Sequence, residues 1–72
     1  DRLNPAGHRL LGEARLARGQ TQAGLASLQR ALEITPNDLP TIVLLLNARI
    51  AAGQDAEALA LARSKRAIAQ GE

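Results

Sequence analysis

The 72-residue sequence contains no cysteine, no methionine and no aromatic residue. Without cysteine no disulfide can strengthen so small a fold, so its stability must come from packing alone. Without aromatic side chains the core must be thin and aliphatic. Alanine and leucine make up 28 of the 33 hydrophobic residues, which favours helices over strands. The composition therefore predicts a small all-α domain.

The residue combinations that catalysis and metal binding require are also missing. His8 is the only histidine, and without cysteine a metal site would have to be built from carboxylates. We expect His8 to be a packing residue. Ser27 and Ser64 have no base at helical spacing, and the glycines do not gather into a phosphate-binding loop. The sequence therefore predicts neither an enzyme nor a cofactor or metal site.

Nucleic acid and direct membrane insertion are not expected either. The net charge is only +2, and the basic run RSKR at 63–66 comes without aromatic residues that could stack on bases. Basic residues near the end of a helix also suit the helix dipole. The longest aliphatic run, IVLLL at 42–46, is far shorter than the roughly 20 residues of a membrane span. These features leave proteins and peptides as the expected partners.

Two features concern the origin of the chain. Eight arginines against one lysine are typical of a GC-rich, bacterial coding sequence. The chain opens on Asp1 rather than methionine, so we expect a segment of a longer protein. Its targeting signals would then lie elsewhere, which leaves the bacterial cytoplasm and the periplasm both open.

Helix start signals divide the sequence into four expected helices, at 5–18, 21–34, 39–52 and 55–69. Asn4 and Asp38 precede two of them as capping residues, and a proline follows each within two residues. Thr21 and Asp55 are expected to cap the other two.

Helix stop signals agree with this division. Gly19 and Gly53 each end a run of apolar positions at helical spacing, as left-handed C-terminal caps do. Pro36 stops the second helix, because it forces Thr35 out of helical geometry. Short loops make sequential helices antiparallel neighbours.

One stretch of the sequence occurs twice. LGEARLARGQ at 11–20 and LLNARIAAGQ at 45–54 lie 34 residues apart and share six of ten residues in register. A helix–turn–helix unit of this length has the period of the tetratricopeptide repeat. Counted from Pro5, that family's recurring residues fall on Leu11-Gly12, Gly19, Ala31-Leu32 and Pro36. Counted from Leu39, the second unit keeps Leu45, Gly53 and Ala58 but ends differently, with Lys65-Arg66 and Gln70.

The sequence therefore resembles a segment of a tetratricopeptide-repeat protein. The resemblance implies a single all-α domain over residues 1–72, with two antiparallel helix–turn–helix repeats stacked as a short right-handed solenoid. Repeat one would span 5–38, and a degenerate repeat two would span 39–70.

The large aromatic packing residues of the family are missing from both units. Their positions hold His8, Arg15 and Leu28 in the first unit and Ile42, Arg49 and Ala62 in the second. Gly12 and Gly24 are expected to offset part of this loss by facing each other across the first helix pair. A glycine inside a helix costs roughly 1 kcal/mol relative to alanine, so close packing is the expected reason for both.

In this family the first helix of each unit lines a concave groove that binds ligands. The resemblance assigns six residues to this groove: Arg9, Glu13, Leu16, Val43, Asn47 and Ile50. Asn47 stands where family members often hold a peptide backbone, and a solvent-facing asparagine is the alternative. Arg9 and Glu13 are four residues apart and are expected to neutralise each other.

Arg15 and Arg49 occupy the same place in both units. One interpretation is a pair of guanidinium groups that clamps acidic groups of a partner. The preferred interpretation is structural: each side chain lays its stem on the adjacent helix and keeps its guanidinium in solvent.

Two functions remain as the main hypotheses. The first is a protein-interaction module that binds a peptide or helix of a partner in the groove. The second is an architectural or self-association segment of a longer solenoid. A regulatory part of an enzyme located elsewhere in the protein is a further alternative. The run at 42–46 makes the third helix apolar around most of its circumference, and repeat arrays generally need at least three units. We therefore expect the isolated chain to self-associate as a dimer or larger.

Overall fold

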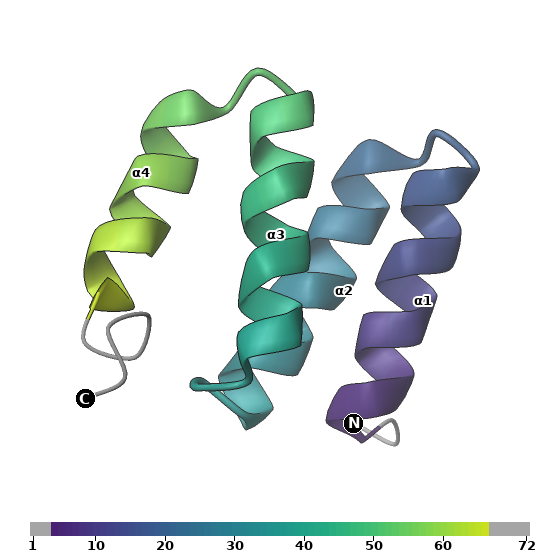
Figure 1. The fold of residues 1–72 in the computed structure, drawn as a ribbon. Coiled ribbons are helices and arrows are strands. Elements are labelled where there is room, and N and C mark those ends of the chain that lie inside the picture. Colours follow the sequence, from purple (N-terminus) through teal and green to yellow (C-terminus); the bar gives the residue numbers. More distant parts are fainter. Residues whose placement is uncertain (1–3, 67–72) are drawn as a thin grey trace.

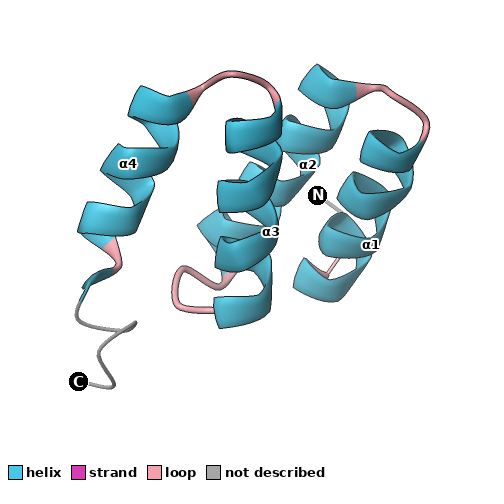
Figure 2. Cartoon of the chain, turned by 45° about the horizontal axis from the view of Figure 1, so that its top comes forward, coloured by secondary structure: helices cyan, strands magenta, loops and turns pink. Residues whose placement is uncertain are grey.

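The computed structural model describes residues 4–66, which form four helices joined by short loops. The helices are α1 (Pro5–Ala17), α2 (Thr21–Ile34), α3 (Leu39–Ala51) and α4 (Asp55–Ser64). Successive helices run antiparallel and pack in chain order, from α1 at one end to α4 at the other (Figure 1). Figure 2 shows the same order from another side, and the described part of the chain contains no strand. The prediction of a compact all-α fold with four helices is confirmed.

Helices α1 and α3 begin at the capping residues that the sequence predicts. The Asn4 side chain accepts a hydrogen bond from the backbone N–H of Gly7 at 2.7 Å. The Asp38 carboxylate accepts one from the backbone N–H of Thr41 at 3.3 Å and a second from the Thr41 hydroxyl. In both helices the caps satisfy N–H groups that have no partner within the helix.

The predicted caps of α2 and α4 are wrong. Thr21 and Asp55 are the first residues of these helices, and the preceding Gln20 and Gln54 make no side-chain capping bond. The reason is the tight turn before each helix, which leaves no room for an additional residue.

Both of these turns have a glycine in the left-handed region, with φ of 78° at Gly19 and 77° at Gly53. The backbone N–H of Gln20 donates to the carbonyl oxygen of Arg15 at 2.8 Å, and that of Gln54 to Arg49 at 2.7 Å. This hydrogen bond closes a Schellman turn and satisfies a carbonyl group at the end of the preceding helix. Two turns of the same geometry therefore lie 34 residues apart.

The ends of α2 and α4 differ in how well the sequence predicts them. Helix α2 ends at Ile34, because Thr35 has φ of −127° and ψ of 86° ahead of Pro36. Helix α4 ends at Ser64, not at residue 69 as expected, and the Ser64 hydroxyl donates back to the Leu61 carbonyl oxygen at 2.8 Å. The expected residues 67–69 of this helix, and Gln70 at the end of repeat two, lie outside the described residues.

The core lies mainly between α2 and α3. Its buried cluster consists of Leu25 and Leu28 from α2 and of Leu45 and Ala48 from α3. The leucines that pack against it from all four helices are Leu16, Leu32, Leu44 and Leu61. His8 is buried in α1, at a position where the resemblance expects a large side chain. The core is thin and aliphatic, as the composition requires.

Helices α1 and α2 are in backbone contact at Gly12 and Gly24. A Cβ atom on Gly12 would lie 3.1 Å from the Gly24 carbonyl oxygen and 2.8 Å from the Leu28 side chain. A Cβ atom on Gly24 would lie 3.1 Å from the Gly12 carbonyl oxygen and 2.7 Å from Leu16. Such distances leave no space for a side chain at either position. The contact between α1 and α2 is accordingly the most extensive of the molecule.

The second helix pair lacks this contact. Thirty-four residues after Gly12 and Gly24 the chain has Leu46 and Ala58. In the repeat register these two residues correspond to the glycines that meet in the first pair. Helices α3 and α4 therefore contact each other less extensively than α1 and α2 do.

Gly24→Leu should destabilise or unfold the first helix pair, because the new side chain collides with Leu16 and with the Gly12 backbone. Overpacking typically costs about 1–3 kcal/mol, which is a large part of the stability of so small a domain. Thermal melts followed by circular dichroism measure the effect. Ala26→Leu is the control, because Ala26 lies on the same helix and is exposed. Equal melting temperatures for the two variants would show that the backbone contact does not determine stability.

Candidate functional site

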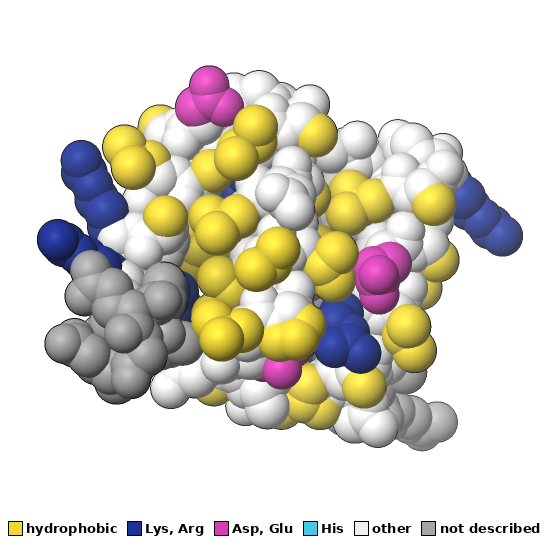
Figure 3. Space-filling view, viewed as in Figure 1, with side chains coloured by type: hydrophobic (Ala, Val, Ile, Leu, Met, Phe, Trp, Pro, Cys, Tyr) yellow, Lys and Arg dark blue, Asp and Glu magenta, His cyan; other side chains and the backbone are white. Residues whose placement is uncertain are grey.

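Helix α3 carries large apolar side chains on its solvent side. Leu39, Val43 and Ile50 are exposed, Val43 by 51% and Ile50 by 57%. On α4, Leu59 is exposed by 51%. Figure 3 shows hydrophobic side chains gathered on the face over α3 and α4. Small proteins rarely leave an apolar surface of this kind uncovered unless it binds something.

A hollow lies between α3 and α4, and we call it the α3–α4 hollow. Its volume is about 470 Å³, and its lining consists of Leu46, Asn47, Ile50, Asp55, Ala58, Leu59 and Ala62. Apart from Asn47 and Asp55 these side chains are apolar. Leu46 and Ala58 replace the glycine pair of α1 and α2, so the hollow opens where the first helix pair is closed.

A second hollow lies where α3 meets the first helix pair, and we call it the α1–α3 hollow. Its volume is about 340 Å³, and its lining includes Leu16, Thr21, Leu44 and Asn47. Asn47 lines both hollows and is the one amide that they share. Of the predicted groove residues, Leu16 and Asn47 line the α1–α3 hollow, and Asn47 and Ile50 line the α3–α4 hollow.

The remaining predicted groove residues lie apart from these hollows. Arg9 lines a separate hollow with Asn4, Thr35 and Asp38 at the opposite end of the helices. Glu13 and Val43 are exposed on α1 and α3, and neither lines the α1–α3 or the α3–α4 hollow. The expected ion pair between Arg9 and Glu13 is not formed, although both residues belong to the described range. Arg9 instead lines a hollow that includes Thr35 and Asp38 from the loop between α2 and α3.

The guanidinium groups of Arg15 and Arg49 each make a hydrogen bond within the chain, which the sequence did not predict. Arg15 donates from Nη1 to the hydroxyl of Ser27 on α2 at 3.1 Å. Arg49 donates from Nη1 to the side-chain oxygen of Gln54 at 2.7 Å. The partners differ because Leu61 stands in α4 where Ser27 stands in α2, and a leucine offers no acceptor.

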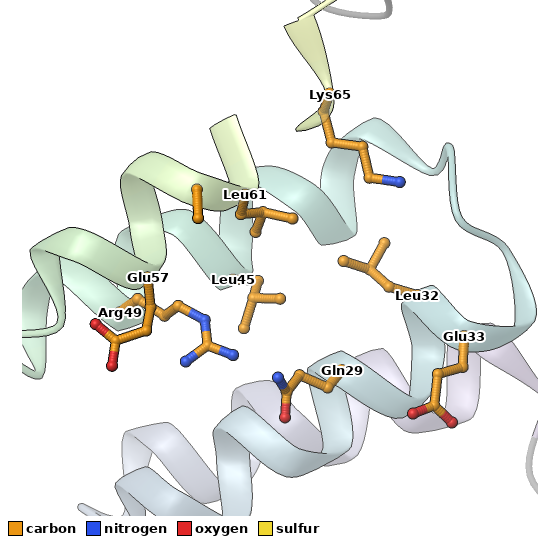
Figure 4. Close-up of a pocket in the computed structure, with 9 residues that line it drawn as sticks. Gln29, Leu32, Glu33, Leu45, Arg49, Glu57, Leu61 and Lys65 are labelled. Carbon is orange, nitrogen blue, oxygen red and sulfur yellow. The ribbon is translucent and has the colours of Figure 1, made fainter. Parts of the chain in front are cut away.

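A fourth hollow, between α2 and α4, was not predicted from the sequence, and we call it the α2–α4 hollow. Figure 4 shows Leu32, Leu45 and Leu61 on its inner side, with charged and amide side chains around them. The charges are mixed, because Arg49 and Lys65 share the lining with Glu33 and Glu57. This mixture favours no anion or cation. The sequence gives no indication of this hollow, because its residues come from three helices and meet only in the folded chain.

Neither a metal site nor a membrane span occurs in residues 4–66. No three histidine, aspartate or glutamate side chains in this range come together in a way that could hold a metal ion. None of its helices combines the length and the apolarity that crossing a bilayer requires. What the described residues offer is an apolar surface with one shared amide.

Arg15→Ala should lower the free energy of unfolding by about 1 kcal/mol, because it leaves the buried hydroxyl of Ser27 without this donor. Urea unfolding measures the change. Arg18→Ala is the control, since Arg18 is exposed and directly follows the same helix as its C-cap. In a double-mutant cycle with Ser27→Ala, a coupling energy of zero would contradict the bond.

Comparisons with known proteins add no relative. No family model matches the chain, and neither a characterised protein nor a solved structure is significantly similar to it. Any assignment of function must therefore rest on the chain's own residues and geometry.

Proposed function

We propose that the chain is a protein–protein interaction module of the tetratricopeptide-repeat type. The two repeats would be 5–38 and 39–70, stacked as a short right-handed solenoid within one domain. Three correspondences at a spacing of 34 residues support this proposal. The caps Asn4 and Asp38, the turn glycines Gly19 and Gly53, and the hydrogen bonds that close the turns all recur in register.

The observation that carries the proposal is the exposed apolar surface of α3 and α4. Val43, Ile50 and Leu59 are each more than half exposed, and Ile50 and Leu59 line the α3–α4 hollow. An amphipathic helix or an extended peptide buries such a surface when it binds. Each fully buried leucine or isoleucine side chain contributes on the order of 2 kcal/mol to the binding free energy. Burial of several such side chains can account for a complex of micromolar affinity.

Asn47 supplies the polar contact that this surface would otherwise lack. It is exposed, and it lies at the boundary of the α1–α3 and α3–α4 hollows. An amide can donate to a backbone carbonyl and accept from a backbone N–H at once. We assign it the role of fixing the direction of a bound peptide.

The proposal includes no catalysis, no cofactor and no nucleic acid. The alternative function is an architectural or self-association segment of a longer solenoid. Leu10 favours this alternative, because it is 60% exposed on α1, at the other end of the molecule. A binding surface for one peptide does not require it.

Selection of displayed peptides against the folded chain tests the interaction module. Selected peptides should carry apolar residues at helical or alternating spacing. Asn47→Ala should weaken their binding by about 1–3 kcal/mol, because polar groups of the peptide lose their partner. Titration calorimetry with one selected synthetic peptide measures the affinity.

Ile34→Ala is the control, because Ile34 is exposed on α2 and lines none of the four hollows described above. Arg15→Ala and Arg49→Ala should lower stability and leave the affinity of the folded protein unchanged. If Arg49→Ala abolishes binding while Asn47→Ala does not, the α2–α4 hollow is the binding site and our assignment is wrong.

A further inference from the structure

Helix α3 rests on a surface of the first helix pair that the second pair repeats. This surface includes Leu16 of α1 and the buried Leu25 of α2. Thirty-four residues later the same places hold Ile50 and Leu59. Leu25 is 3% exposed, whereas Leu59 is 51% exposed. The first pair has a surface on which α3 packs. The second pair has the equivalent surface at the α3–α4 hollow, where nothing covers it within the described residues.

The side of α3 that packs on the first pair also has a counterpart, which lies in α1. Leu44, Leu45 and Ala48 of α3 pack on the first pair. Thirty-four residues earlier α1 has Leu10, Leu11 and Ala14, so all three residue types are identical. We call these three residues the α1 face. Leu10 and Ala14 are exposed there.

The α1 face and the α3–α4 hollow are at opposite ends of the molecule, since α1 and α4 are the outermost helices (Figure 1). The α1 face cannot reach the hollow of its own chain. The α1 face can reach the hollow of another molecule. It has the same residue types as the side of α3 that packs on the equivalent surface within the chain.

Charge favours the same contact. Thr21 and Ala52 both line the α1–α3 hollow, where α3 meets the first pair. Their counterparts at the two ends are Asp55 and Arg18, both exposed. Two neutral residues within the chain thus correspond to an opposite-charge pair between chains. One change opposes the contact, because Glu13 corresponds to Asn47.

We propose that a second copy of this chain docks its α1 face in the α3–α4 hollow, in the way that α3 rests on α1 and α2. This inference names the partner of the surface proposed above and rests on that proposal. Because the two contacting surfaces are different, the contact is head-to-tail. Such contacts add further copies and form open chains, whereas a symmetric contact stops at the dimer.

Sedimentation velocity with interference optics tests this, since the chain has no aromatic absorbance. The wild-type mass should rise with concentration beyond that of a dimer. Leu10→Glu and Leu59→Glu should each weaken association at least about 100-fold, because each buries an unpaired charge in an apolar contact. Both residues are more than half exposed, so circular dichroism should show the wild-type helix content in both variants.

Mixing the two variants is the decisive measurement. The Leu10→Glu protein keeps its hollow, and the Leu59→Glu protein keeps its α1 face. Together they should form a dimer of one copy each and nothing larger. Ile34→Glu is the control, because Ile34 is exposed on α2 and belongs neither to the α1 face nor to the hollow. It should associate as the wild type does.

The charged pair gives a second, independent readout. Arg18→Asp and Asp55→Arg should each weaken association about 2- to 5-fold, as exposed ion pairs do. The double variant should recover wild-type association. If neither charge reversal changes association, the proposed register between the two copies is wrong.

Two outcomes overturn the inference and leave the interaction surface standing. One is a wild-type chain that stays monomeric at millimolar concentration while Leu59→Glu still abolishes binding of a selected peptide. The other is association that Leu59→Glu prevents but Leu10→Glu does not, which would indicate a symmetric contact. If Leu59→Glu affects neither association nor peptide binding, the inference and the proposed function both fail.

Discussion

The backbone contact between Gly12 and Gly24 is the constraint on which the arrangement of the helices depends. It brings α1 and α2 close enough for the Leu16 and Leu28 side chains to lie directly against the facing glycines. The paired helices then form one continuous surface, and α3 packs on it to complete the core. A chain without aromatic residues has few other ways to bury sufficient area, so it uses closeness in place of side-chain size.

The second helix pair shows what happens when this constraint is relaxed. Its turn at Gly53 and its cap at Asp38 match those of the first pair, but it has Leu46 and Ala58 in place of the two glycines, and its helices contact each other less extensively. The result is an open hollow rather than a closed contact. The closed contact of the first pair and the open hollow of the second differ at these two corresponding positions.

The sequence predicted the helices well because their boundaries depend on local chemistry. Pro36 and the turn glycines act within a few residues of themselves, and the structure has the boundaries they indicate. The caps at Thr21 and Asp55 were wrong because a Schellman turn shortens the loop before each of them. The site was harder to predict. The positions of Arg9 and Arg49, and the α2–α4 hollow, depend on which side chains meet across helices, and spacing along one helix does not contain that information.

The sizes of the side chains at positions 46 and 58 also bear on the width of the α3–α4 hollow. Residues 46 and 58 lie away from the turns and caps, so their volume can change while the boundaries of α3 and α4 stay fixed. Smaller residues would let the helices approach and close the hollow, and larger residues would widen it. Copies of this unit that differ at these two positions would therefore have hollows of different widths.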